Sequence, residues 1–546
     1  MTAPLRNLPQ PSEVISPMPA NDAAYNPALQ TGSLLRFITC GSVDDGKSTL
    51  IGRVLYEAGA VLDDQMDALD RDSQKFGTTG AAPDFALLVD GLSAEREQRI
   101  TIDVAYRYFA TEKRAFIVAD TPGHEQYTRN MATGASTADL AVILVDARKG
   151  LLPQTRRHAY IVSLVGVRHI VVAINKMDLV GYEAGVFEQI ERDFLAMAGD
   201  LGFVSITCIP VSARGGDNVV KRSEKMGWYN GPALLPFLER IEPSELSGTD
   251  SGFAFPVQWV NRPSLDFRGY AGTIAMGTIK AGDAVMALPS RTRTRIARIV
   301  TSEGDLASAS AGQAVTLTTT EEIDLSRGDL LVSEASEVLV RNGAAVRLLT
   351  TANRTLAEGD QFLVKLGTAT AQATIAEIRH AIDIETFDAR PAKALGLNAI
   401  GLATLRFDQP LSFTSYRTNR ELGSLILIDR ITNETAAFGV LDEAAAPVAQ
   451  PVPDSLHNRL RRIEERWLGR AGTEKRQDRV TRLSWRLSSS VLPGVLVYLA
   501  SGSPVWGLGA MLVDAGARSL LRHRHDRAWR RARAKAPGTL ENGGGI

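Results

Sequence analysis

The sequence is poor in cysteine, with only Cys40 and Cys208 among its 546 residues. Each lies in an apolar stretch typical of a buried strand, and their spacing matches neither a disulfide framework nor a metal motif. We therefore expect two small buried thiols in a reducing compartment, the cytoplasm. A small disulfide-stabilised secreted scaffold is excluded.

Long apolar runs are also missing. The two longest, within residues 487–517, span about 14 residues each, whereas a spanning helix usually needs about 20. Basic segments at 459–486 and 518–535 flank them. This pattern is typical of a tight hairpin that enters the inner membrane from the cytoplasm and returns, and equally of a soluble helical hairpin docked on another surface. Residues 1–33 lack a secretory signal pattern and indicate a flexible leader.

The chain has almost no net charge, −1 overall, but the balance is uneven along it. Residues 454–546 hold 18 Lys and Arg against 8 Asp and Glu, so residues 1–453 carry a net charge of −11. An acidic front part disfavours general binding of nucleic acid, and any attraction to an anionic surface resides in the last stretch.

A phosphate-binding loop is the clearest motif present. It fits G-x-x-x-x-G-K-[ST] without a mismatch and follows an apolar strand at 34–40. Its glycines let backbone N–H groups and a helix N-terminus surround an anion. The lysine would reach the β- and γ-phosphates, and the serine would ligate Mg²⁺. The predicted nucleotide contacts here are Gly41, Ser42, Val43, Asp44, Asp45, Gly46, Lys47, Ser48 and Thr49.

Three further motifs follow apolar strands at 115–119, 170–174 and 206–211. The first includes an aspartate placed to hold Mg²⁺ through water. The second has the N-K-x-D pattern, whose aspartate accepts hydrogen bonds from guanine but not from adenine, and the third is the matching guanine-side loop. GTP with Mg²⁺ is therefore the predicted ligand pair, and the predicted residues are Asp120, Thr121, Pro122, Gly123 and His124; Asn175, Lys176, Met177 and Asp178; Ser212 and Ala213.

Two side chains are assigned to catalysis together with Lys47. Thr101, in the segment 95–103 that corresponds to switch I, is placed to sense the γ-phosphate and complete the Mg²⁺ shell with Ser48. His124, directly after the glycine of switch II, is placed to orient the attacking water.

The fold class predicted from hydrophobic patterning is α/β, with a parallel sheet covered by helices on both faces, followed by two antiparallel barrels. Residues 62–94 form a polar insertion before switch I. The predicted parts are a leader at 1–33, a GTP-binding domain at 34–245, barrels at 250–335 and 336–443, a linker at 444–458, a basic helical hairpin at 459–536 and a flexible tail at 537–546.

Residues 34–443 resemble the GTP-binding large subunit of bacterial sulfate adenylyltransferase, a relative of elongation factor Tu. The likeness is most specific in four segments, at 41–53, 95–107, 120–131 and N-R-P-x-L-D-F-R-G-Y at 261–270. Translation factors usually have histidine and threonine at Asp45 and Ser48 and lack the fourth segment. The family usually has glycine at Arg99, so the behaviour of switch I is in doubt at that position.

The resemblance implies a GTPase that drives formation of adenosine 5′-phosphosulfate and pyrophosphate from ATP and sulfate, the first step of sulfate assimilation. It also implies a separate ATP-binding small subunit that performs the nucleotidyl transfer. No second phosphate-loop motif is present, so no adenylylsulfate kinase domain is expected. The alternative is a translation-type GTPase that binds tRNA or the ribosome.

The C-terminal stretch resembles a small bacterial membrane-associated domain of unknown function. The likeness rests on Ser484-Trp485-Arg486 before the first apolar run and on His525 and Trp529 after the second. It favours the membrane hairpin, with residues 487–517 attaching an otherwise cytoplasmic protein to the inner membrane.

Overall fold

The computed structural model of the protein describes residues 33–76, 83–89, 95, 101–242, 252–264 and 267–442, all within the unit Met1–Val448. The predicted leader, Arg99 of switch I, and the hairpin with its membrane segment at 487–517 lie outside these residues. No described helix is long and apolar enough to cross a membrane.

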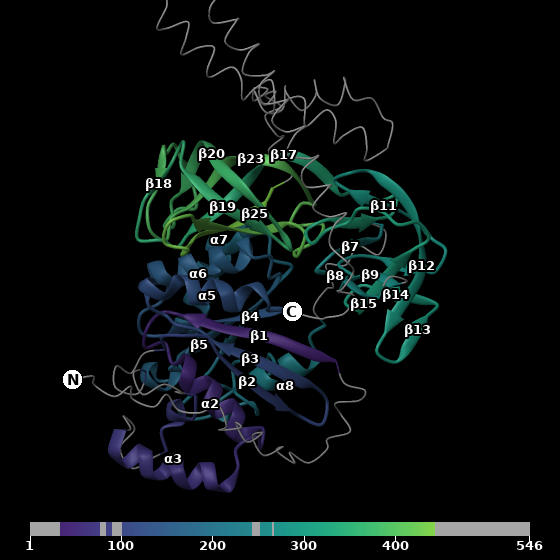
Figure 1. The fold of residues 1–546 in the computed structure, drawn as a ribbon. Helices are drawn as coiled ribbons and strands as arrows, with labels where there is room; N and C mark the ends of the chain where they lie inside the picture. Colours follow the sequence, from purple (N-terminus) through teal and green to yellow (C-terminus); the bar gives the residue numbers. More distant parts are fainter. Residues whose placement is uncertain are drawn as a thin grey trace, which may run out of the picture. The chain divides into compact units, whose positions relative to one another are not determined.

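The first part is a six-stranded sheet covered by helices on both faces. In Figure 1, α5 and α6 lie on one side of it, and α2 and α8 lie on the other. The strands are β1 Leu34–Gly41, β2 Ala105–Ala110, β3 Ala115–Asp120, β4 Leu140–Asp146, β5 His169–Asn175 and β6 Ser205–Pro210. The helices are α2 Lys47–Glu57, α3 Asp63–Phe76, α5 Thr128–Ser136, α6 Pro153–Leu164, α7 Ala184–Ala198 and α8 Leu234–Arg240, with 3₁₀ turns η1 Phe85–Leu88, η2 Glu125–Tyr127, η3 Met177–Val180, η4 Gly199–Leu201 and η5 Glu224–Met226.

The sheet is mixed, so the prediction of a purely parallel sheet was wrong. The strand order is β2-β3-β1-β4-β5-β6, and β2 runs antiparallel to β3. Only residues 111–114 connect these two strands, and so short a connection permits a hairpin but no parallel crossover. The other strand pairs are parallel. Their carboxyl ends therefore meet at one edge, as the motif analysis requires.

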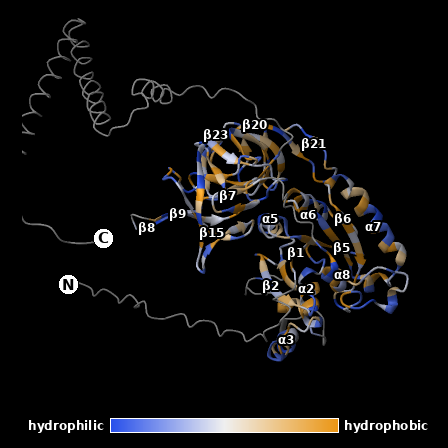
Figure 2. Cartoon of the chain, turned by 90° about the vertical axis from the view of Figure 1, so that its right-hand side faces the viewer, coloured by the Kyte–Doolittle hydropathy of each residue, from blue (hydrophilic) through white to orange (hydrophobic). Residues whose placement is uncertain are grey.

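The core lies between the sheet and its helices. Every residue of β4 and β5 is buried, which explains their unbroken apolar sequences, and Figure 2 shows β1 and β5 in hydrophobic colours while α3 is mostly hydrophilic. Cys40 and Cys208 are free and buried, as predicted. Burial raises the pKa of each thiol to about 12, so neither is a thiolate at neutral pH.

The polar insertion holds more structure than the sequence suggested. Its residues include the amphipathic helix α3, with Leu69 and Ser73 on the buried side, and the turn η1. Asp84 caps η1 by accepting a hydrogen bond from the Ala86 N–H at 3.2 Å. Leu69 and Ser73 lie four residues apart, which is helical spacing, but the many aspartates between the apolar positions hid this period.

Two antiparallel sheets follow, as predicted. The first has the order β7-β16-β11-β12-β15-β9-β8, with β13 paired to β12 and a separate β10-β14 pair. The second has the order β19-β24-β25-β17-β23-β20-β21, and a β19–β20 pairing closes it into a barrel. The strands are β7 Ala254–Pro256, β8 Trp259–Ser264, β9 Phe267–Thr273, β10 Thr278–Lys280, β11 Ala284–Leu288, β12 Thr292–Thr301, β13 Gly304–Leu306, β14 Ser308–Ser310, β15 Ala314–Thr319 and β16 Leu330–Val332; then β17 Leu339–Thr350, β18 Leu356–Ala357, β19 Gln361–Leu366, β20 Ala369–Ile382, β21 Ala389–Arg390, β22 Ala394–Leu395, β23 Ile400–Phe413, β24 Ser424–Asp429 and β25 Thr435–Leu441.

The second barrel packs directly on the nucleotide-domain helices. The buried Tyr416 hydroxyl donates to the Val165 carbonyl at 2.8 Å, and the Arg420 guanidinium donates to the Ala138 carbonyl at 3.3 Å and to that of Gly166. Leu349 and Ile400 of the barrel belong to the same apolar cluster as the sheet. A buried interface of this kind lets a change in one part be felt in the other.

Gly52 of α2 gives a stability test of how the insertion is attached. A Cβ at Gly52 would lie 2.0 Å from the Phe85 carbonyl oxygen of η1, whereas one at Gly185 of α7 would meet no atom within 4 Å. We expect Gly52→Ala to lower the free energy of unfolding by about 1–3 kcal/mol through overpacking, despite the better helix propensity of alanine. The matched Gly185→Ala should be neutral or slightly stabilising in the same denaturant titration. Equal effects of the two changes would contradict the close packing of η1 on α2.

Candidate functional site

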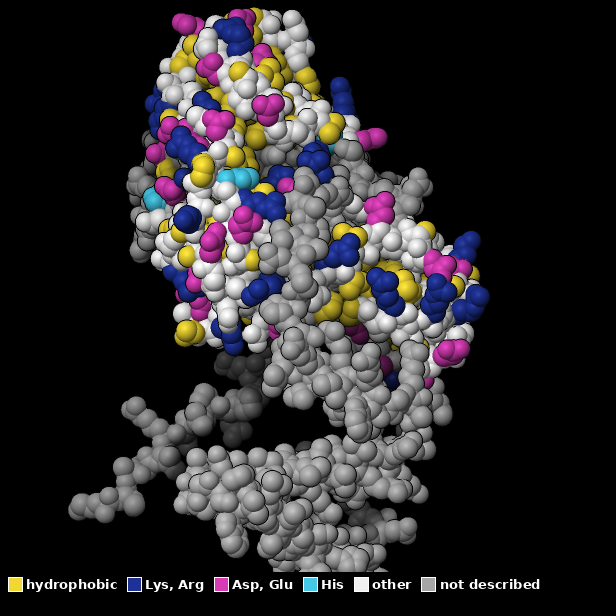
Figure 3. Space-filling model, turned by 90° about the horizontal axis from the view of Figure 1, so that it is seen from above, with side chains coloured by type: hydrophobic (Ala, Val, Ile, Leu, Met, Phe, Trp, Pro, Cys, Tyr) yellow, Lys and Arg dark blue, Asp and Glu magenta, His cyan; other side chains and the backbone are white. Residues whose placement is uncertain are grey.

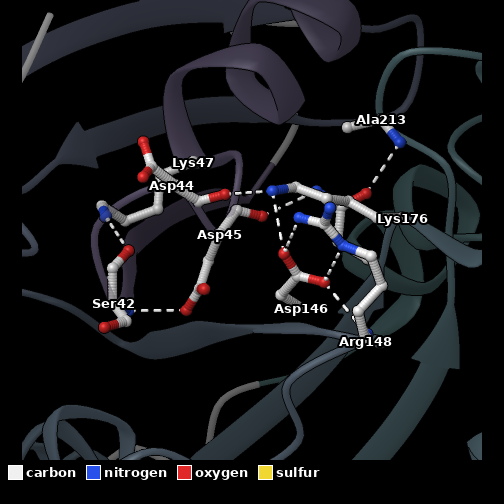
Figure 4. Close-up of polar contacts among 9 residues, drawn as sticks. Ser42, Asp44, Asp45, Lys47, Asp146, Arg148, Lys176 and Ala213 are labelled. Carbon is white, nitrogen blue, oxygen red and sulfur yellow. Dashed lines mark hydrogen bonds and ion pairs between the residues drawn. The ribbon is translucent and has the colours of Figure 1, made fainter. Parts of the chain in front are cut away.

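The phosphate loop joins β1 to α2 and is shaped by its own backbone. Gly46 has φ +92°, a left-handed conformation that favours glycine, and its carbonyl accepts the first helical hydrogen bond of α2 from Leu50 at 2.9 Å. Within the loop, the Ser42 N–H donates to the Asp45 carboxylate at 2.6 Å (Figure 4). Asp45 is buried, and burial raises its pKa.

Lys47 is a buried cation at the centre of the site. Its Nζ donates to the carbonyls of Ser42 at 2.8 Å and Gly41 at 3.3 Å, so the side chain folds over the loop (Figure 4). Burial lowers the pKa of Lys47, while the carboxylates of Asp120 and Asp45 act in the opposite direction. A phosphate chain laid on this loop would be met by the lysine without a large movement.

Three oxygen-bearing side chains converge beside the lysine. The Ser48 hydroxyl donates to Asp120 Oδ2 at 2.8 Å and lies 3.5 Å from the Thr101 hydroxyl. The other Asp120 oxygen accepts from Thr39 at 3.2 Å, and burial raises the Asp120 pKa. Hydroxyl and carboxylate oxygens are the ligands that Mg²⁺ prefers. The donor set therefore fits a magnesium ion, in the combination that the sequence predicted.

The D-T-P-G-H segment after β3 packs against the phosphate loop. The Thr121 hydroxyl donates to the Thr39 carbonyl at 2.7 Å, and a Cβ at Gly123 would lie 2.5 Å from Lys47 Nζ, so only glycine fits there. Pro122 is buried beside them, whereas His124 is exposed. His124 Nδ1 caps η2 by accepting from the Gln126 N–H at 3.2 Å, which leaves Nε2 to carry the ring proton.

Asn175 joins the phosphate loop to the two guanine-side motifs. Its side-chain amide donates to the Asp45 carbonyl at 2.8 Å and accepts from the Ala213 N–H at 2.9 Å. Lys176, at φ +66°, donates to the Asp44 carbonyl. Met177 and Ser212 are buried supports, and Asp178 is half-buried in η3. The structure thus brings all four predicted motifs to one edge of the sheet.

Two residues of the site were missed by the sequence analysis. Asp146, at the end of β4, accepts a two-pronged ion pair from Arg148 at 3.0 and 2.6 Å and a further bond from Lys176 at 3.0 Å (Figure 4). Burial alone would raise the Asp146 pKa, but these hydrogen bonds hold it well below its usual range. The position of Asp146 at a strand end next to the other motifs was the available signal.

His158 of α6 was also missed. Its buried Nδ1 accepts from the Gly41 N–H at 3.0 Å, and its Nε2 lies 2.9 Å from the Gln154 side-chain amide. Burial lowers the His158 pKa to about 3, so the ring is neutral and can accept this bond throughout the physiological range. No sequence signal links a helix 117 residues away to the first loop glycine.

Comparison with known families agrees with this geometry. Residues 33–244 match the elongation factor Tu GTP binding domain, and residues 344–442 match the GTP-eEF1A C-terminal domain-like family. The two matches cover the nucleotide domain and the second barrel. The predicted fold class, a phosphate-loop GTPase domain followed by antiparallel barrels, is confirmed.

Individual relatives are more specific. The chain is 53% identical to sulfate adenylyltransferase subunit 1 of Citrobacter koseri, covering 77% of this chain and 88% of that protein. It is 52% identical to the bifunctional enzyme CysN/CysC of Xylella fastidiosa, covering 77% and 67%. It is 53% identical to the bifunctional enzyme NodQ of Rhizobium sp., covering 76% of this chain and only 64% of that longer protein. By its identity and coverage, the chain belongs to the sulfate adenylyltransferase subunit 1 family of elongation factor Tu-type GTPases.

Proposed function

We propose that the predicted site residues bind GTP with Mg²⁺ in the arrangement described above. The loop residues from Gly41 to Thr49 surround the phosphates, and Ser48 and Thr101 would ligate the ion, with Asp120 acting through water. Asp178 would read the guanine N1–H and 2-amino group. A bound Mg²⁺ supplies charge neutralisation at the phosphates. His124 is then positioned near the water that attacks the γ-phosphate.

The proposed reaction is hydrolysis of GTP coupled to adenylyl transfer from ATP to sulfate in a heteromer. The observation that carries it is the convergence of four GTPase motifs in a chain that covers 88% of a sulfate adenylyltransferase subunit 1. We infer that a separate small subunit holds ATP and performs the transfer in the cytoplasm. Coupling would follow from nucleotide-dependent changes in the segments around Thr101 and His124.

The translation-factor alternative is less well supported. The relatives reported above carry metabolic names, and the face in Figure 3 has Lys, Arg, Asp and Glu side chains interspersed. A protein that grips RNA usually presents a continuous basic surface. Attachment to the inner membrane through residues 487–517 and the absence of a kinase domain stay predictions from the sequence.

The coupled function is tested with Lys47→Ala. We expect the parental chain with its small subunit to form adenosine phosphosulfate faster when GTP is added. Lys47→Ala should bind GTP at least about 100-fold more weakly, because two charge-assisted contacts to phosphate are lost, and should abolish the stimulation. Lys113→Ala, which removes an exposed lysine paired with Glu239, is the control. Absence of GTP stimulation in the parental pair would contradict the proposed function.

Asp178→Asn should change which base is bound. The carboxylate accepts two hydrogen bonds from guanine, whereas an amide offers one acceptor and one donor. We expect GTP affinity to fall about 10- to 100-fold, while XTP, whose base has a carbonyl at position 2, binds better than to the parental chain. Competition between the two nucleotides measures this. Asp193→Asn, at an exposed site of α7, should leave the preference for GTP unchanged, and a retained preference in Asp178→Asn would disprove the assignment.

His124→Ala should separate binding from hydrolysis. The ring acts on water and not on the nucleotide, so we expect GTP affinity to stay within about twofold while single-turnover hydrolysis slows about 100-fold. His380→Ala, in β20, serves as the histidine control. Hydrolysis at the parental rate would show that the cap on η2 is the whole role of His124.

A further inference from the structure

The nucleotide domain carries an open apolar groove that none of its motifs uses. The groove encloses about 390 Å³ and lies between α2, α3, η1 and β2. Its apolar wall is formed by Leu55, Val61, Leu69, Leu87 and Leu88, with Tyr108 at the rim. Tyr108 is 72% exposed and its neighbour Tyr106 is 40% exposed. Exposed aromatic rings beside an apolar hollow are typical of protein contact sites.

The strand that borders the groove has an unpaired edge. Among the described strands, β2 pairs only with β3, and it is the outermost strand of its sheet. Figure 2 shows β2 at the margin of the domain beside α2 and α3. An extended segment of another protein can add to such an edge through main-chain hydrogen bonds, while its side chains enter the adjacent hollow.

The charge of the groove rim selects its partner. Helix α3 contains five aspartates against one arginine and one lysine. Gln65, Leu69 and Asp72 line the groove at intervals of three to four residues, so the exposed Asp67 and Asp70 flank this face. An acidic rim around an apolar hollow favours a partner segment with apolar side chains between basic ones, and disfavours an anionic membrane surface or nucleic acid.

The groove is also joined to the segment that senses nucleotide. The Arg107 guanidinium, on the groove wall, donates to the Val89 carbonyl at 2.8 Å. Val89 closes η1, and β2 starts four residues after Thr101, whose hydroxyl lies near Ser48. A protein seated in the groove would therefore contact both η1 and the strand that continues from Thr101.

From these four observations we infer that the groove bounded by α3, η1 and β2 is the docking site of the small subunit, which adds a basic and apolar segment to the β2 edge. This rests on the proposed two-subunit function. Docking here gives the ATP-binding partner direct contact with chain segments whose position depends on GTP.

Binding of the purified small subunit to the full chain, measured by titration calorimetry, tests this inference. Tyr108→Glu should weaken binding at least tenfold, because it places a charge at an apolar, acidic contact. It should leave GTP hydrolysis by the isolated chain unchanged, since Tyr108 touches no part of the nucleotide site. Asp67→Lys should weaken binding several-fold at low salt and reduce its salt dependence.

Leu195→Glu is the matched control, because Leu195 of α7 is an exposed apolar residue (45%) outside the groove; its affinity should be parental. Parental affinity of Tyr108→Glu would overturn the inference, as would weakened binding by Trp259→Glu alone, which would move the contact to β8. Failure of the parental chain to bind the small subunit would instead contradict the proposed function itself, and the inference with it.

Discussion

The side chain of Asn175 is the constraint on which the nucleotide site depends. One amide spans from the phosphate loop, at the Asp45 carbonyl, to the guanine-side loop, at the Ala213 N–H. Both partners are buried backbone groups, so losing the amide would leave two of them unsatisfied at a cost of about 1–3 kcal/mol each. Because the β1, β5 and β6 loops share this one residue, their relative positions are set before any ligand arrives.

Buried charge explains why such a site favours an anionic ligand. Lys47, Asp45 and Asp120 lie in a low-dielectric interior, where uncompensated charge is costly. Burial raises the pKa of the two carboxyls and lowers that of the lysine, so the group is strained toward its neutral forms. Phosphate oxygens beside Lys47 and a cation beside Asp120 would each stabilise the charged form, which couples nucleotide and metal in one binding event.

The second barrel extends the site beyond the nucleotide domain. The Asn398 side chain donates to the Glu125 carbonyl at 2.9 Å, directly after His124, and the Glu125 carboxylate pairs with Arg157 of α6 at 2.7 Å. The same helix holds Gly41 through His158. A change at the γ-phosphate thus has a short path of polar contacts to the barrel, through groups that have two well-defined arrangements available.

The sequence by itself determined the parts of this protein whose chemistry is local. The loop from Gly41 to Ser48 and the motifs at Asp120 and Asn175 follow strands that are apolar throughout, so both their type and their shared edge could be predicted. Several barrel strands, such as Gln361–Leu366, were likewise predicted from alternation and turns. These features depend on residues close together in the chain.

Tertiary structure alone decided what depends on distant residues. The reversal of β2, the helix α3 hidden among aspartates, and the supports from Asp146 and His158 all require knowing which segments pack together. His158 carries no motif, and its role exists only because α6 crosses behind Gly41. Packing is set by the sum of many weak, non-local contacts, and a local pattern does not encode which distant partner a side chain will meet.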